Sequence, residues 1–366
     1  MVTWLRQTTT YHPWIGWWFV PNLKALTPAM YHSHASPGWQ WWFIPKPLKS
    51  YATDYFVVTN SIGMRSDREY LAHQSDSRHR IILLGDSYTA GSFVKNGDRF
   101  SDLLEQSNPN LDVMNFGLPG SGTDQQLLVY ESIARGFEAD AYIFAPCTTN
   151  IMRNMSGLFL FTPRGTENAR YRAKPYFTIE EGELTLHNQP VPKTLLTPEE
   201  AFERLGTSGV LGIFNMGVSP LRYMIKDFLP KWMQGNSLVG RISHSLGPPF
   251  KVYESEKSRP WQVMRAIIER FVKQVNGKPV FIVPLPTDYH YMTDIHPRYM
   301  ERFFEIEKAY DNCYVIDLLP WFKRMPLDER RECGFFNDIH YSPLGHRVVA
   351  NALVDSISKH CPELLS

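Results

Sequence analysis

Short apolar segments alternate with longer amphipathic segments through two stretches of this chain, residues 78–155 and 258–366. The apolar segments have the length of buried strands, and the amphipathic segments have helical spacing. Strands separated by helical segments of this length favour a parallel sheet with helices on both faces. The sequence therefore predicts an α/β fold. The expected strands are 80–84, 111–115, 141–145, 279–284 and 313–317, and the expected helices are 88–106, 123–136, 258–275, 297–309 and 343–359.

A serine follows the first predicted strand directly. Ile81–Leu84 are four consecutive apolar residues, Gly85 ends the run, and Asp86-Ser87 lies on the turn into a helix. Open α/β sheets place their active sites at the carboxyl edge, where this serine would project. The first-turn amides of the helix also stabilise negative charge nearby. Because serine is a poor nucleophile until a histidine takes its proton, the chain must also supply a base.

A histidine near the C-terminus meets that need. The segment Asp338-Ile339-His340 lies shortly before the last predicted helix. An aspartate two residues from a histidine on one loop can hold the imidazole in the tautomer that accepts the serine proton. We therefore expect Ser87 as the nucleophile, His340 as the base and Asp338 as the acid that orients the base.

This order of motifs resembles the SGNH (GDSL-type) hydrolase superfamily, over about residues 78–155 and 278–358. That family has an early Gly-Asp-Ser block with the nucleophile and a late Asp-x-x-His or Asp-x-His block with the acid and base. The Gly-x-Ser-x-Gly elbow of α/β-hydrolases is missing here. The Asp-x-x-His form would put Asn337 at the acid position, and because Asn337 has no carboxylate we prefer Asp338. The resemblance implies a three-layer, flavodoxin-like SGNH-hydrolase fold with a parallel sheet.

Two middle segments resemble the blocks that complete the oxyanion hole in this family. Gly120 matches the glycine whose backbone amide donates to the oxyanion, and the Ser87 amide would be a second donor. The third block of the family usually reads Gly-x-Asn-Asp, and the side chain of its Asn is a further donor. Here Thr149 stands at the Asn position and Asn150 at the Asp position. Either Thr149 or Asn150 donates, and we favour Asn150 because an amide N–H is the better fixed donor.

Composition argues against several classes of partner. Lys+Arg 38 and Asp+Glu 37 give a net charge of +1, so there is no charge excess for nucleic acid or an anionic membrane.

The four cysteines form no Cys-x-x-Cys pair, and we expect free buried thiols in a reducing compartment, no metal and no cofactor. No apolar run approaches the ~20 residues that span a bilayer. No signal peptide is evident either, so the expected location is cytoplasmic.

Two segments lie outside the resemblance. Residues 1–77 form an aromatic- and proline-rich arm, and residues 156–257 form an insertion that divides the core into 78–155 and 258–366. The arm either builds an aromatic wall for a lipid or glycan substrate or packs its tryptophans on the core, and we favour packing. The insertion is either a lid over the active-site edge or a satellite subdomain. If these segments shape an apolar substrate pocket, its candidate residues are Trp39, Trp41, Trp42, Met216, Met224 and Phe228.

The sequence thus predicts a serine-dependent ester hydrolase or acyltransferase of the SGNH type. Its substrate would carry an O-acyl group on a glycan, a lipid or a small metabolite. The alternative is a catalytically weak or inactive protein that keeps the fold for binding or as a scaffold, and Thr149 in place of Asn favours that alternative. A resemblance in fold does not name the acyl group or the acceptor.

Overall fold

The computed structural model describes most of the two core stretches and parts of the arm and the insertion. The described residues are 8–27, 55–74, 77–161, 170–197, 199–201, 203, 251–293, 297–335 and 339–366. Among these residues, no helix combines the length and the apolar character needed to cross a bilayer.

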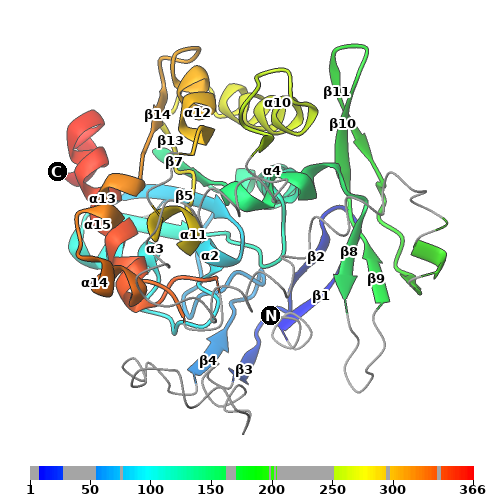
Figure 1. Cartoon of the computed structure of the whole chain (residues 1–366). Coiled ribbons are helices and arrows are strands. Elements are labelled where there is room, and N and C mark those ends of the chain that lie inside the picture. Colours follow the sequence, from blue (N-terminus) through cyan, green and yellow to red (C-terminus); the bar gives the residue numbers. More distant parts are fainter. Residues whose placement is uncertain are drawn as a thin grey trace, which may run out of the picture.

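Five parallel strands form the central sheet (Figure 1). They are β5 (His79–Gly85), β6 (Leu111–Asn115), β7 (Ala141–Ala145), β13 (Val280–Ile282) and β14 (Cys313–Val315). Across the sheet the order is β6-β5-β7-β13-β14. Numbered along the chain, this is the 2-1-3-4-5 order of flavodoxin-like folds. The expected fold class is confirmed.

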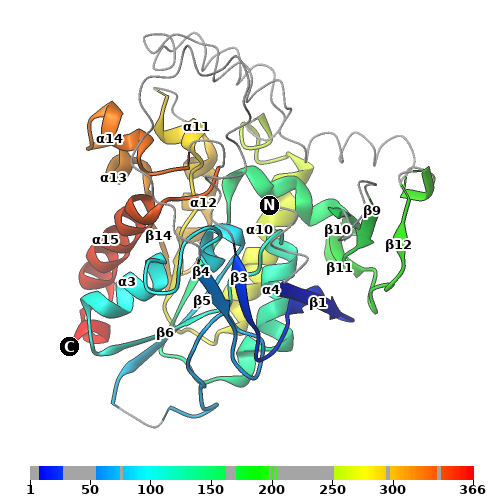
Figure 2. The same ribbon diagram turned by 90° about the horizontal axis from the view of Figure 1, so that it is seen from below.

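Helices cover both faces of this sheet (Figure 2). The main ones are α3 (Phe100–Ser107), α4 (Thr123–Ser132), α10 (Arg259–Gln274), α12 (Tyr299–Glu307) and α15 (Pro343–His360). On one face α3 packs against α15, and on the other α4 packs against α10. Trp261 of α10 contacts Phe303 of α12 with 5.3 Å between ring centroids. The three-layer arrangement follows from these contacts.

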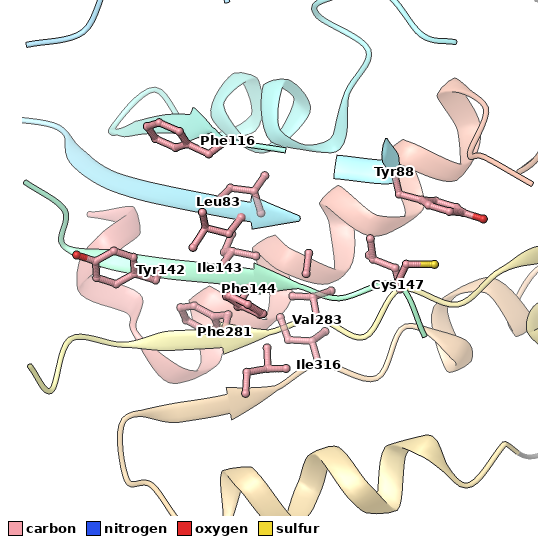
Figure 3. Packing of buried hydrophobic residues seen from close by; sticks show 14 of the residues in the cluster. Leu83, Tyr88, Phe116, Tyr142, Ile143, Phe144, Cys147, Phe281, Val283 and Ile316 are labelled. Atoms are coloured by element: carbon pink, nitrogen blue, oxygen red, sulfur yellow. The ribbon is translucent and has the colours of Figure 1, made fainter. Parts of the chain in front are cut away.

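The core lies where the sheet meets these helices (Figure 3). Residues 81–84 of β5 have no exposed side-chain surface, as expected for a strand covered on both faces. Removing one such side chain from water contributes about 1.5–3 kcal/mol. In Figure 3, Tyr88 and Cys147 lie beyond the arrowheads of the strands, on the carboxyl side of the packed core. The carboxyl edge of the sheet, where the sequence predicts the active site, therefore borders a well-packed core.

The expected single helix 88–106 is wrong. The chain forms two helices there, α2 (Ser87–Ala90) and α3, joined by a loop. Gly91 ends α2 with a φ of 71°, and Phe93 has a φ of 69°. Both values lie in the left-handed region, which a right-handed helix cannot contain. The amphipathic pattern therefore continues across a real break in the helix.

Part of the arm packs on the core. It contributes the strands β1 (Thr9–His12), β2 (Gly16–Phe19), β3 (Lys24–Thr27) and β4 (Tyr55–Val58). β1 pairs with β2 and β3 pairs with β4, both antiparallel. Trp17 and Trp18 are buried, and their indole N–H groups donate to Pro119 O at 3.0 Å and Ile62 O at 2.8 Å. For these two tryptophans, packing on the core is confirmed. Trp39, Trp41 and Trp42 lie outside the described residues.

The described part of the insertion is a set of short antiparallel strands. They are β8 (Leu158–Phe161), β9 (Arg170–Ala173), β10 (Tyr176–Glu180), β11 (Glu183–His187) and β12 (Leu195–Leu196). The expected hairpin turning at Glu181-Gly182 is confirmed by the pairing of β10 with β11. A small second cluster of buried residues includes Leu158, Ala173 and Val191. The boundaries of arm, core and insertion, and the choice between lid and subdomain, stay predictions.

Short helices fill several loops that follow the strands. η4 (Thr148–Met155) follows β7, and α11 (Asp288–Tyr291) follows β13, so both lie at the carboxyl edge. Parallel strands bring such loops together at one edge of the sheet. The remaining short elements are η3 (Ala134–Gly136), α13 (Leu319–Lys323), α14 (Leu327–Arg331) and η5 (Pro362–Leu365).

Candidate active site

A tight turn at the end of β5 presents Ser87 at the carboxyl edge. A Cβ atom on Gly85 would lie 1.9 Å from Thr89 Oγ1, so only glycine fits this turn. Asp86 caps α2, because its carboxylate accepts a hydrogen bond from the Tyr88 amide at 3.0 Å. Ser87 is thereby the first residue of α2 and is 4% exposed. The strand order reverses between β5 and β7, and such switch points are where α/β sheets bind ligands.

Ser87 contacts the predicted base. His340 Nε2 lies 2.7 Å from Ser87 Oγ, although 253 residues separate them in sequence. The imidazole has no exposed surface. A nucleophile and base at this distance have the geometry required for proton transfer from the hydroxyl to the ring. The sequence predicted that these two side chains would meet, and the structure places them in hydrogen-bond contact.

Backbone pairing holds the loop that carries His340. Phe335 N–H donates to His340 O at 3.3 Å, and Ser342 N–H donates to Cys333 O at 2.9 Å. Ser342 then caps α15, accepting from the Gly345 amide at 3.4 Å. The base is therefore tied to the start of the last long helix. Asp338 and its rival Asn337 lie outside the described residues, so the identity of the acid stays a prediction.

Two aromatic rings contact the imidazole of His340. Tyr88 lies 4.8 Å away between ring centroids, and Phe93 lies 5.3 Å away with its ring nearly perpendicular. The Tyr88 hydroxyl also donates to the backbone oxygen of Ile339. Both rings come from the segment directly after the nucleophile. The position of the base is therefore coupled to the conformation of residues 88–93.

The loop after β6, residues 116–122, will be called the second-block loop. A Cβ atom on Gly117 would lie 2.3 Å from the backbone nitrogen of Ala90, so glycine permits close approach to α2. Asn115 fixes the same junction, because its side-chain amide donates to Thr89 O and Ser101 Oγ, both at 2.7 Å. These contacts hold the second-block loop against the helix that carries Ser87.

Two backbone amides are without acceptors among the described residues. In the described part of the chain, neither the Ser87 N–H nor the Gly120 N–H donates to another residue. Ser87 is the first residue of its helix, where amides have no intrahelical partner. Gly120 has a φ of 78°, and the next amide, Ser121 N–H, donates back to Leu118 O at 3.2 Å. Backbone donors of this kind are the usual components of an oxyanion hole.

The side chains of η4 that were predicted to donate have other partners. Asn150 Nδ2 donates to Asp86 Oδ2 at 2.5 Å. Thr149 Oγ1 lies 3.3 Å from the sulfur of Cys147. The Asn150 amide keeps one further N–H, so its bond to Asp86 fixes the amide without exhausting it. The choice between Asn150 and Thr149 as the oxyanion donor stays a prediction.

Arg153 of η4 interacts electrostatically with the buried carboxylate of Asp86. Burial raises the pKa of the Asp86 carboxyl group, while the charge of Arg153 and the bonds from Tyr88 and Asn150 oppose that increase. Burial lowers the pKa of the Arg153 guanidinium, and attraction to Asp86 opposes the decrease. Arg153 Nη1 also donates to Ser121 O in the second-block loop at 3.1 Å. Arg153 therefore links η4 to that loop.

A buried ion pair fixes the far end of η4. Lys174, just after β9, pairs with Asp124 in the first turn of α4, and neither side chain has exposed surface. Lys174 Nζ also donates to Arg153 O at 2.9 Å and to Ser156 O at 3.2 Å. Burial raises the pKa of Asp124 and lowers that of Lys174, against their mutual attraction. The insertion thus supplies a cation that holds the backbone of η4.

The remaining predictions concern a metal site, the cysteines and the substrate pocket. Among the described residues, no group of three or more His, Cys, Asp or Glu side chains could hold a metal ion. The four cysteines are buried and free, as expected. The proposed pocket residues Met216, Met224 and Phe228 fall outside the part of the chain that the structure describes. The pocket therefore stays a prediction.

Sequence reasoning missed several residues that contact the site. Tyr88 and Phe93 contact His340, but an aromatic residue in an amphipathic segment gives no signal beyond core packing. Arg153 and Lys174 were also missed. Arg153 lies four residues after Thr149 in the irregular third block, and that proximity was the one available signal.

Comparisons with known proteins give similarities to solved structures only. No protein-family profile and no curated protein matches the chain. One similar structure is a lipolytic G-D-S-L family protein from Veillonella parvula, 14% identical, covering 77% of this chain and 99% of its own, with a TM-score of 0.40. A lipase/acylhydrolase from Enterococcus faecalis is 13% identical, with coverage of 77% and 96% and a TM-score of 0.40. An acetylxylan esterase from Geobacillus stearothermophilus is 12% identical, with coverage of 77% and 94% and a TM-score of 0.40.

Similarities at this level carry no weight for function, and the fold assignment rests on the order of the parallel strands. That order, with Ser87 after the first core strand and His340 before the last helix, agrees with the arrangement that the motifs implied. The chain therefore has a flavodoxin-like fold, with Ser87 and His340 in contact at the carboxyl edge of its sheet.

Proposed function

We propose that this protein is a serine-dependent ester hydrolase or acyltransferase. The observation that carries the proposal is the 2.7 Å contact between Ser87 Oγ and His340 Nε2. It is supported by the backbone amides of Ser87 and Gly120, which have no protein acceptor among the described residues. This combination supports a nucleophile with its base beside donors for a developing negative charge. A serine buried for packing alone would need neither the histidine nor the open amides.

In this mechanism Ser87 attacks the carbonyl carbon of an ester while His340 takes the hydroxyl proton. Asp338, on the same loop as His340, would orient the imidazole. The amides of Ser87 and Gly120, together with Asn150 or Thr149, stabilise the tetrahedral oxyanion. His340 then protonates the leaving alcohol, and water or a second alcohol takes the acyl group by the reverse steps. The substrate class is an O-acyl ester of a glycan, a lipid or a small metabolite.

One observation favours the alternative of a weak enzyme or a binding protein. The Asn150 amide donates to Asp86, and the Thr149 hydroxyl lies against Cys147. Both side chains therefore already have a partner other than an oxyanion. Loss of one such donor typically raises the barrier by ~3 kcal/mol. A protein with two backbone donors alone would still react, but slowly.

Covalent labelling tests the proposal directly. A fluorophosphonate probe should modify the wild-type protein, and peptide mass spectrometry should place the adduct on Ser87. Ser87→Ala should abolish labelling. Ser92→Ala is the matched control, because Ser92 is also buried and lies just after the helix that carries Ser87, and that variant should label normally. Absence of labelling in a folded wild-type protein would refute the proposal and favour the binding or scaffold role.

A further inference from the structure

Arg65, a buried arginine from outside the core stretches, contacts the segment after the nucleophile. It is 1% exposed. Its Nη1 donates to Ala90 O at 2.7 Å and to Gly91 O at 2.6 Å, and its Nη2 donates to Val94 O at 2.6 Å. Its Nε donates to Asn96 Oδ1 at 3.0 Å. One side chain therefore donates to four acceptors within residues 90–96.

The helix that presents Ser87 is too short to stabilise itself. α2 has four residues, and the last carbonyls of any helix have no intrahelical partner. Arg65 donates to the carbonyls of Ala90 and Gly91 at that end, and the Val94 amide also donates to Gly91 O at 3.2 Å. A positive charge is also favoured at a helix C-terminus, where the carbonyl dipoles converge. The guanidinium thus replaces the bonds that a longer helix would provide.

The hydrogen bonds from Arg65 lie on both sides of Phe93, a strained residue that contacts His340. Phe93 has a φ of 69°, a conformation that side chains larger than glycine rarely adopt. Such a residue keeps this conformation only where its surroundings determine it. Arg65 binds the backbone oxygens of Gly91 and Val94 on either side of it. Phe93 in turn contacts the His340 ring at 5.3 Å and the Phe335 ring at 6.0 Å.

Arg65 itself is positioned independently of α2. It follows a tight turn in which the Met64 amide donates to Asn60 Oδ1 at 2.9 Å. The backbone oxygen of Arg65 accepts from Arg99 Nη1 at 2.8 Å, and Arg99 pairs with Asp102 of α3 at 2.7 Å. The guanidinium is therefore presented by a part of the structure that does not include the reacting groups.

We propose that Arg65 is a positioning residue for the Ser87–His340 pair, which acts by holding the C-terminus of α2 and by fixing Phe93 against the imidazole. This inference rests on the proposed function, because it concerns the same two reacting groups. Arg65 is buried and bonded to residues 90–96, so it acts through those residues. Its loss should therefore lower turnover more than it weakens substrate binding.

The test compares Arg65 with a second buried arginine. Arg80 is 5% exposed and binds Asp112 at 2.8 Å and Leu71 O at 2.8 Å, at the amino end of β5 and thus away from Ser87. Arg65→Met, Arg65→Lys and the matched Arg80→Met and Arg80→Lys are assayed with p-nitrophenyl acetate, below the unfolding temperature of each variant. Thermal unfolding is measured for all four variants.

We expect Arg65→Met to lower kcat by on the order of 100-fold with little change in KM, since a misplacement of about 1 Å costs that much. Arg65→Lys should recover part of the turnover, because a lysine keeps the charge and some of the donors. The Arg80 variants should lose stability and keep kcat. Equal kcat losses in the Arg65 and Arg80 variants, or a rise in KM alone for Arg65, would overturn the inference.

If the Arg65 variants do not fold, the variant Phe93→Gly tests the positioning role instead. Glycine relieves the positive φ and removes the ring, so the protein should stay folded while kcat falls. An unchanged kcat in Phe93→Gly would refute the positioning role. Fluorophosphonate labelling of the wild type separates this failure from failure of the proposed function. If the wild type labels at Ser87 and Phe93→Gly labels at the same rate, only the positioning inference is wrong.

Discussion

The second-block loop and η4 flank the nucleophile at the same edge of the sheet, yet they are built differently. The second-block loop is fixed by close approach of glycine to backbone, and its Gly120 amide has no acceptor in the part of the chain that the structure describes. η4 offers side chains, and its Asn150 and Thr149 already contact Asp86 and Cys147. Backbone donors are set by the fold, whereas side-chain donors depend on their neighbours. A backbone donor can therefore be expected from the fold, whereas a side-chain donor also depends on how neighbouring loops pack.

The two regions also differ in what supports them. The second-block loop rests on core residues, among them Asn115, which binds Thr89 and Ser101. The backbone of η4 is held from the insertion by Lys174. Lys174 thus connects the insertion directly to η4.

The base should matter more than any residue of either region. His340→Asn should lower kcat for p-nitrophenyl acetate by about 10⁴-fold or more, because a serine without its base is nearly inert. His346→Asn is the control, since His346 is equally buried and lies six residues later. Its imidazole accepts from the Phe100 amide at 3.2 Å, so this substitution should cost stability and leave kcat in place. Equal activity in both variants would refute the role of His340.

The buried ion pair between Lys174 and Asp124 should contribute much more to the free energy of unfolding than a surface ion pair does. Lys174→Met leaves Asp124 buried without its cation, and removal of one partner of such a pair costs about 3–5 kcal/mol. Urea unfolding measures this loss. Lys95→Met is the control, because Lys95 is 62% exposed where it pairs with Asp98 at 3.9 Å, and surface pairs contribute about 0–1 kcal/mol.

A double substitution sharpens the same comparison. Lys174→Met combined with Asp124→Leu removes both charges, and an apolar replacement of a buried pair is often neutral. We expect the double variant to regain much of the stability that Lys174→Met loses. If the double variant is as unstable as the single one, the loss comes from the backbone bonds of Lys174 rather than from the stranded carboxylate.

The side-chain donors of η4 can be ranked by kinetics. Asn150→Ala should lower turnover on p-nitrophenyl acetate by on the order of 100-fold if its free N–H reaches the oxyanion. Thr149→Val should then have little effect. The reverse ranking would assign the donor to Thr149. If both variants turn over like the wild type, the oxyanion hole consists of backbone amides alone.

Selectivity for the acyl chain should be the smallest effect per step. Each methylene buried in an apolar pocket favours binding by ~0.8 kcal/mol, which is about fourfold in kcat/KM. With p-nitrophenyl esters from acetate to decanoate, kcat/KM should therefore rise until the pocket is full. Trp39→Ala and Met224→Ala should flatten the rise if the arm and the insertion line that pocket. A profile that is flat or falls from acetate upward would leave a small-acyl esterase as the surviving interpretation.

The sequence predicted the parts of the fold that local patterns determine. β5, β6 and β7 lie where the apolar runs indicated, and the serine and histidine met across 253 residues because each lies at a strand or helix boundary. The break between α2 and α3 was missed because Phe93 takes a positive φ that only tertiary contacts impose. The bond from Asn150 to Asp86 likewise depends on how two loops pack. Periodicity carries no information about either.

The decisive measurement is the structure of a phosphonate adduct on Ser87. We expect a phosphonyl oxygen within about 2.7–3.1 Å of both the Ser87 and the Gly120 amide nitrogens, with His340 beside the modified serine. A phosphonyl oxygen directed away from both amides would refute the proposed oxyanion hole, because the two backbone donors would then have no part in stabilising the oxyanion.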